Sequence, residues 1–348
     1  MKYKLLLTIY MIFVSLNVMA LTVTVDFGNT TINSDTNLLN AIATEVENAL
    51  GKYDDMPLFA KGMGNANTYA ASAATMRGYQ GYSIFSIAVG TMAAIQAPSG
   101  DPKFYEDMQD DLDSGDLYAG VGCNPVVVQI GLNLSFLVED LYMAFRFGKF
   151  DYEIDTGDFK IDYNSNLIGV LINYQLIKEH AILSRALLWR GISLESGLIY
   201  SNNKIAFYKE LDTLYSITGS TFTADVDPSI DFMLDMTGYI IPVELYTSLR
   251  LFYVLNFGAG AGFDYAAAGK TDLSLKSSGE AVITAGGLEG TEGTITVDAG
   301  TNNVKPDRFR PKFMANVGLS AGPVFIDVPV TYYLDNAFSV GITAGFVW

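Results

Sequence analysis

The sequence predicts an all-β fold, an antiparallel transmembrane β-barrel of about ten strands, with a short N-terminal helical segment. Three observations support this prediction. The last residues alternate, and since successive side chains of a strand point to opposite faces, one face carries Phe338, Val340, Ile342, Ala344, Phe346 and Trp348. The same period of two recurs upstream as far as residue 81. Hydrophobic residues make up 50% of the chain, yet its net charge is −17.

This composition is unusual for a soluble extracellular domain. It is typical of a barrel, which exposes an apolar face to lipid and keeps its charges in the loops and the lumen. The acidity argues against nucleic-acid binding, which needs a basic surface. Cys123 is the single cysteine, so no intramolecular disulfide can form.

Residues 1–20 have the pattern of a secretory signal peptide. Lys2 and Lys4 precede an apolar stretch over residues 5–14, and Val18-Met19-Ala20 is a typical cleavage site. The alternative is a membrane anchor, but a spanning helix needs about 20 apolar residues. We expect cleavage after Ala20, which removes two lysines and changes the net charge from −17 to −19.

Residues 21–78 predict a helical, plug-like segment. Ser34 or Asp35 can cap a helix that ends at Gly51. A second stretch, residues 60–78, is rich in Gly, Ala, Asn and Ser, and it lacks the Gly-Lys-Ser/Thr ending of a phosphate loop. Two arrangements fit: a segment inside the lumen or the periplasm, or a helix that packs against the barrel rim.

Residues 79–348 predict the barrel. Ten segments alternate, at about residues 82–97, 126–136, 141–154, 168–176, 192–201, 239–250, 255–265, 313–320, 324–332 and 338–348. One face of each is apolar, whereas Gly, Ala, Ser and Asn dominate the other. A secreted β-sandwich would also bury its apolar faces, but its outer face would carry Lys, Glu and Thr. The alternation changes phase near Gly148, which predicts a one-residue bulge there.

The links between the segments differ in length. Residues 138–140 and 251–253 predict short periplasmic turns, whereas 99–118, 206–228 and 273–308 predict long outside loops. Both chain ends then lie in the periplasm, so the strand number is even. Twelve strands are possible if the long loops contain extra hairpin arms.

Aromatic residues are expected at the periplasmic rim, where barrels carry an aromatic girdle. The predicted members are Phe136, Tyr142, Trp189, Phe252, Tyr253 and Trp348. The tail that contains Phe346 and ends on Trp348 is similar to the C-terminal strand of bacterial outer-membrane barrels. This likeness implies that the barrel-assembly machinery recognises that strand.

Over residues 79–348 the chain resembles bacterial integral outer-membrane β-barrel proteins. The segment Gly62-Met63-Gly64-Asn65-Ala66-Asn67 is similar to the N-terminal plug of fatty-acid-transporter barrels, although that family has fourteen strands. Val328-Pro329-Val330-Thr331-Tyr332-Tyr333, followed by a tight turn and an aromatic-ended strand, resembles spirochaete surface barrels, some of which are described as adhesins. The resemblance implies a location in the cell outer membrane, with outer-membrane lipid as a partner.

Charged residues on the predicted inner face are candidates for the functional site: Arg146, Glu195, Glu244, Arg250, Asp264 and Asp327. Mixed signs favour a salt-bridge network, with a weakly selective constriction as the alternative, because buried ions need partners. The only histidine, His180, lies in a charged turn without catalytic partners, so the sequence predicts no enzyme and no cofactor. The acidic loop at residues 111–116 lacks the calcium-loop pattern because Gly115 occupies the fifth position, so no metal site is predicted.

Two functions fit these features. The first is a passive or plug-gated channel or transporter for a small solute or lipid. The alternative is a surface-exposed adhesin or structural barrel that binds host matrix or envelope partners through its long loops.

Overall fold

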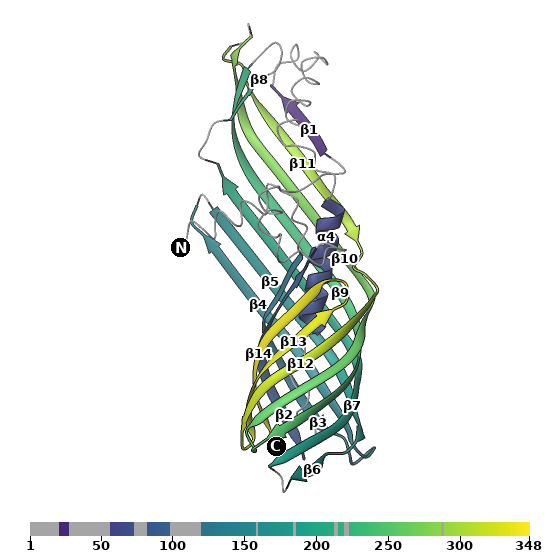
Figure 1. Cartoon of the computed structure of the whole chain (residues 1–348). Coiled ribbons are helices and arrows are strands. Elements are labelled where there is room, and N and C mark those ends of the chain that lie inside the picture. Colours follow the sequence, from purple (N-terminus) through teal and green to yellow (C-terminus); the bar gives the residue numbers. More distant parts are fainter. Residues whose placement is uncertain are drawn as a thin grey trace.

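The computed structural model describes residues 21–27, 56–72, 82–97, 120–157, 159–183, 186–211, 215–218, 223–286 and 289–348. In these ranges the chain forms helix α4 (Met56–Ser72) and fourteen strands (Figure 1). The strands are β1 (Leu21–Asp26), β2 (Phe85–Gln96), β3 (Gly120–Asn133), β4 (Leu141–Asp155), β5 (Phe159–Ile177), β6 (His180–Leu183), β7 (Leu187–Glu210), β8 (Tyr215–Thr218), β9 (Thr223–Leu251), β10 (Leu255–Ala285), β11 (Glu292–Val304), β12 (Phe309–Ala321), β13 (Val324–Tyr333) and β14 (Ala337–Val347).

Ten of these strands close into a ring, which confirms the predicted antiparallel barrel. The order around the ring is β2, β3, β4, β5, β7, β9, β10, β12, β13, β14 and again β2. Closure comes from β14, which pairs with β2 from Ala337–Gln96 to Val347–Ser86. The backbone N–H of Ile84 also donates to the Trp348 carbonyl at 2.9 Å, so the last residue is hydrogen-bonded next to the first ring strand.

The ring is apolar outside and polar inside, the reverse of a soluble sandwich. Every ring strand exposes large apolar side chains, for example Ile87, Leu132, Phe145, Ile172, Leu194, Leu245, Phe257, Val317, Ile326 and Ile342. Every ring strand also buries a polar side chain on its other face, for example Ser86, Gln129, Arg146, Asn173, Ser193, Glu244, Asp264, Asn316, Asp327 and Thr343. A membrane-spanning β-barrel has this pattern, with an apolar face outward and a polar face toward the lumen.

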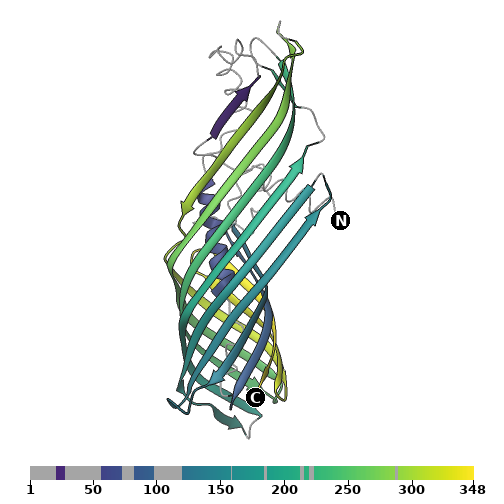
Figure 2. The same cartoon turned by 180° about the vertical axis from the view of Figure 1, so that it is seen from behind.

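One side of the sheet continues beyond the ring as an arm. The arm consists of residues 149–155 of β4, 159–166 of β5, 202–210 of β7, 223–237 of β9 and 270–285 of β10, together with β1, β8 and β11. Figures 1 and 2 show it rising from the end of the ring that lies opposite the short turns. The arm gives the molecule a second surface that does not belong to the barrel wall.

The outward face changes from apolar to polar within one row of the sheet. Ile168, Tyr200 and Tyr239 lie side by side across β5, β7 and β9, and the two tyrosine rings are 4.9 Å apart. The next row carries Asn166, Asn202, Thr237 and Lys270. This boundary is where the surrounding medium of the sheet would change from lipid to water.

Three details of the sequence prediction are wrong. Residues 206–228 and 273–308 are not long loops, because β7, β9, β10 and β11 extend through most of them, as the hairpin-arm alternative required. No bulge interrupts the β4–β5 pairing at Gly148. That pairing keeps one register from Leu141–Tyr174 to Asp155–Lys160. The apolar residues of the sequence move to the other face because β4 loses its neighbour β3 after Phe147 and enters the arm. Tyr142 is buried in the lumen and is not part of an outer girdle.

The N-terminal part contains both a strand and a helix. Residues 21–26 form β1, which pairs with β11 at the outer edge of the arm, although the sequence predicted a helical segment there. The predicted helix at residues 34–51, the signal peptide and the loop at 99–118 lie outside the described residues. Among the helical residues that the structure describes, none form a stretch long and apolar enough to cross a membrane.

Candidate functional site

Helix α4 occupies the part of the lumen next to the arm. Met56, Phe59 and Met63 pack against Phe232 and Leu234 on the inner face of the arm. Ala71, near the other end of the helix, packs inside the ring against Val127, Leu171, Ile199 and Ile240. From residue 59 to residue 71, every residue except Lys61 is buried. Figures 1 and 2 show α4 running alongside the strands of the sheet. The helix is therefore enclosed along most of its length.

Small residues let α4 lie directly against the barrel wall. A side-chain carbon on Gly120 of β3 would overlap the Gly62 carbonyl, and one on Gly122 would overlap the Ala66 carbonyl. The Gly- and Ala-rich composition of α4 also permits this close approach, because any bulkier residue on the helix would push the helix and strand backbones apart.

Side-chain amides fix the position of the helix. Asn65 donates from Nδ2 to Oδ2 of Asp307 at 2.9 Å and accepts from the Asp307 backbone N–H at 2.7 Å. Asn67 accepts at Oδ1 from Asn203 at 2.7 Å and from Ser201 at 3.2 Å. These bonds satisfy polar groups that would otherwise be costly to bury.

Tyr69 of α4 fits into a polar seat on the wall. Its ring lies 4.0 Å from the ring of Tyr333, and the guanidinium of Arg310 lies 4.9 Å from its centroid, within the range of a cation–π contact. Its hydroxyl donates a short hydrogen bond to Asp335 in the turn between β13 and β14, and Arg310 donates from Nη1 to the Thr68 hydroxyl. Burial raises the pKa of the Asp335 carboxyl above its usual value.

A fully buried lysine lies deeper in the ring. Lys312 of β12 donates from Nζ to Glu244 of β9 and to Asp264 of β10, both at 2.6 Å. Asp264 also accepts a hydrogen bond from the Tyr333 hydroxyl at 2.9 Å. Because the tilted rings of Tyr333 and Tyr69 are in contact, the lysine cluster and the helix share one continuous set of contacts.

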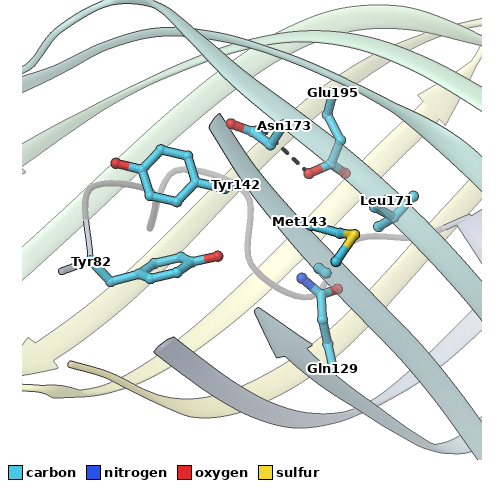
Figure 3. Close-up of a pocket in the computed structure, with 8 residues that line it drawn as sticks. Tyr82, Gln129, Tyr142, Met143, Leu171, Asn173 and Glu195 are labelled. Atoms are coloured by element: carbon cyan, nitrogen blue, oxygen red, sulfur yellow. Dashed lines mark hydrogen bonds between the residues drawn. The ribbon is translucent and has the colours of Figure 1, made fainter. Parts of the chain in front are cut away.

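The opposite wall carries a second polar cluster. Arg146 of β4 donates from Nε to Gln129 at 3.1 Å and from Nη1 to the Ala71 carbonyl at 3.2 Å. A cation is favourable there, because the C-terminal end of a helix carries partial negative charge. Beside it, Asn173 donates to Glu195 at 3.5 Å across a cavity of about 20 Å³, which is also lined by Tyr82 and Tyr142 (Figure 3). That volume suits about one water molecule.

The structure groups the six predicted residues only in part. Glu244 and Asp264 share Lys312, and Asp327 accepts from Asn316 at 2.5 Å on the same wall. Arg146 and Glu195 lie on the opposite wall, and Arg250 is half-buried on β9, across from Asn256. Sequence reasoning missed Lys312, Arg310 and Asp335. The first two share the inward phase of Asn316, so the alternation carried back through Pro311 contains the signal for them.

Other candidates for chemistry give no site. His180 is exposed at the start of β6, where it pairs with Trp189. Within the described ranges, no three His, Cys, Asp or Glu side chains gather in a way that could hold a metal ion. The acidic stretch at residues 111–116 lies outside those ranges. The lumen, with α4 inside it, is the candidate functional site.

Solved structures similar in fold cover most of the chain at low identity. The translocator domain of autotransporter NalP from Neisseria meningitidis is 10% identical, with 92% of this chain and 100% of that one covered and a TM-score of 0.31. CarO from Acinetobacter baumannii is 10% identical over 60% and 96%, with a TM-score of 0.25. A FadL homologue from Pseudomonas aeruginosa is 7% identical over 82% and 98%, with a TM-score of 0.28. With TM-scores this low, these structures do not identify a function.

No curated protein matches the chain. A family description, Lsa36-like, matches residues 18–348, which include all the described strands and α4. Since that match spans nearly the whole chain and the ring has the reversed burial of a lipid-embedded wall, the protein is a member of the Lsa36-like family with the fold of an outer-membrane β-barrel.

Proposed function

We propose that the protein is a plug-gated outer-membrane channel for a small polar solute, with α4 as the plug. One observation carries this proposal. Among the described residues, the parts that fill the lumen without belonging to its wall are α4 and Tyr82, and both precede the first ring strand, β2. The ring pairs β14 directly with β2, so its hydrogen bonds stay complete if the preceding segment withdraws.

The wall favours a polar solute over a lipid. Its buried inner face carries charges of both signs, with Arg146, Glu244 and Lys312 among them, together with amides and hydroxyls. Two features of the described chain support a closed resting state: α4 is buried from residue 59 to residue 71 except at Lys61, and the cavity near Tyr82 has a volume of about 20 Å³, enough for about one water molecule. Passage of a solute therefore requires α4 to move.

A disulfide between helix and wall tests this requirement. In a Cys123→Ser background, Thr68→Cys and Gly238→Cys form a suitable pair, since a side-chain carbon on Gly238 would lie 3.9 Å from Cβ of Thr68, close to the mean of about 3.8 Å in disulfides. In planar bilayers we expect the oxidised variant to lose its channel openings and to regain them on reduction.

Two further variants complete the test. Gly148→Cys with Leu167→Cys joins two wall strands at a Cβ distance of 3.6 Å and leaves α4 unlinked to the wall, so its oxidation should leave openings unchanged. Deletion of residues 56–72 should raise conductance. Openings that persist in the fully oxidised Thr68–Gly238 variant, or no rise in conductance on deletion, would refute the plug.

A second candidate function is supported by the arm. Its strands continue past the apolar belt, and a cleft of about 570 Å³ between them is lined by Tyr208, Glu210, Asp227 and Glu280. This surface fits an adhesin or structural barrel whose host-matrix or envelope partner carries positive charge. Asp227→Lys with Glu280→Lys, two residues directly opposite each other, should abolish binding to immobilised matrix protein.

The matched change Glu153→Lys with Asp155→Lys alters the same number of charges elsewhere on the arm. Binding that survives the change in the cleft, or that is lost equally with the matched change, would reject this second function. Both proposed functions include export by a signal peptide at residues 1–20. They also include recognition of the Phe346–Trp348 tail by the barrel-assembly machinery and contact of the barrel with outer-membrane lipid.

A further inference from the structure

One side of α4 is held by three polar residues from the wall at its arm end. Asp307 precedes β12 and binds Asn65 and Lys61, the latter at 2.9 Å. Arg310 of β12 donates to Thr68, and Asp335 accepts from Tyr69. The other side of the helix meets the glycines of β3 and apolar side chains, with further polar contacts from Ser201 and Asn203 to Asn67 and from Arg146 to the Ala71 carbonyl. The contacts of α4 with the acidic side chains of Asp307 and Asp335 lie on the side of the helix near Tyr69.

The seat of Tyr69 contains buried atoms whose hydrogen-bonding capacity is not used. Arg310 is 0% exposed, and its Nε and Nη2 atoms have no hydrogen-bond partner in the described part of the chain. Oδ1 of Asp335 is likewise buried without a partner there. A buried carboxylate with one unsatisfied oxygen is costly. The Tyr69 hydrogen bond and the Arg310 charge favour the carboxylate, but burial outweighs them, so ionisation of Asp335 opposes the seated position of α4.

We propose that Asp335 is a proton-sensitive latch, which secures α4 in the lumen when its carboxyl group takes up a proton and loosens the helix when it is ionised. This inference rests on the proposed gating function. The charged and titratable groups around Asp335 are Tyr69 on α4, Arg310 on β12, Asp307 before β12 and Tyr333 on β13.

The direction of the pH effect follows from the environment of the carboxyl group. Burial raises the pKa of seated Asp335, whereas withdrawal of α4 returns it to water, where an aspartate has a pKa of about 3.9. A group whose pKa is higher in the closed state favours that state as the pH falls. Acidification from neutral pH should therefore tighten the latch, and the effect should level off at about pH 4.

The test compares the native latch with Asp335→Asn, which keeps an acceptor oxygen for Tyr69 but cannot ionise. Ala70→Cys in the Cys123→Ser background gives a thiol that is buried at rest. In proteoliposomes we measure its labelling by a water-soluble maleimide across a pH series. The ratio of the two labelling rates at each pH cancels the intrinsic pH dependence of the thiol.

We expect the native latch to label several-fold faster than Asp335→Asn at neutral pH and the ratio to approach one as the pH falls. Asp298→Asn, an exposed carboxylate of the arm, serves as the control and should leave labelling unchanged. A ratio that is constant with pH overturns the latch while leaving the plug in place.

Absence of labelling in both forms at every pH would instead refute the gating function. In that case, urea unfolding in detergent tests whether Asp335 acts as the latch. The difference in midpoint between Asp335→Asn and the native protein should shrink on acidification, and a constant difference overturns the latch.

Discussion

Replacement of Lys312 by methionine tests whether the lumen is dry. Methionine has a similar length, so the change removes the shared cation from Glu244 and Asp264 without leaving a large cavity. All three residues are essentially inaccessible to solvent, and both ion pairs measure 2.6 Å.

The expected loss follows from the distance and the burial. At 2.6 Å and an effective dielectric constant of about 20, each pair gains about 6 kcal/mol before desolvation. Removal of one partner from a buried ion pair typically costs about 3–5 kcal/mol, because desolvation offsets part of the gain and the remaining charge stays buried. In a water-filled lumen the same pairs would contribute only about 0–1 kcal/mol.

The assay is the free energy of unfolding in urea, measured in detergent micelles. We expect Lys312→Met to lose about 3–5 kcal/mol. The triple variant with Glu244→Gln and Asp264→Asn should recover most of that loss, since no uncompensated charge remains. A loss below about 1 kcal/mol for the single variant would show that water reaches the lysine and that the lumen is not closed.

Three further predictions concern the helix seat, the lipid-facing wall and chain assembly. Gly122→Ala should lower the free energy of unfolding by about 1–3 kcal/mol, because the new methyl group overlaps the helix backbone, whereas Gly169→Ala, which faces wall residues only, should have a smaller effect. Ile342→Lys in the middle of β14 should cost about 2–4 kcal/mol in bilayers, but Met233→Lys on the arm should be nearly neutral; equal costs would place both in the same medium. Trp348→Ala keeps both backbone hydrogen bonds of that residue, so it should reduce the heat-modifiable form in cells without impairing refolding in detergent, and unchanged assembly would argue against its role as a signal.

The ring was predictable because its two faces meet different surroundings along its whole height. The last strand was predicted at residues 338–348 and is observed at Ala337–Val347. Short turns at residues 138–140 and 251–253 were also predicted, and positive φ angles at Asp140, Phe252 and Tyr253 are consistent with tight reversals there. Strict alternation of bulky apolar with small or polar residues specifies both the strand and the side that lipid covers.

The arm was not predictable from the same signal, because its outward face meets water. In β9, Asp227, Asp231 and Asp235 lie on the outward face, whereas Phe232 and Leu234 lie beneath α4. Barrel strands were expected to be apolar on their outward face. The arm segments carry polar residues there and apolar residues only on part of the inner face, so the sequence predicted loops.

The helix was predictable as a helix but not in its location. Gly, Ala and Asn at residues 60–71 fit several surroundings, and only the contacts of Gly62 and Ala66 with distant Gly120 and Gly122 place the helix within the ring. Lys312 was missed for a local reason: Pro311 precedes the segment in which the alternation was first clear, so the inward phase was not followed back.

Nitroxide accessibility in bilayers tests the central claim most directly, with single labels at Ile342, Thr343 and Met233 in the Cys123→Ser background. We expect the label at 342 to collide with oxygen but not with a water-soluble nickel chelate, since this side chain faces lipid. The label at the buried lumen position 343 should be shielded from both, and the label at 233 on the arm should meet the nickel chelate. Nickel access at 342, or oxygen access at 343 equal to that at 342, would contradict a closed barrel whose apolar outside is covered by lipid.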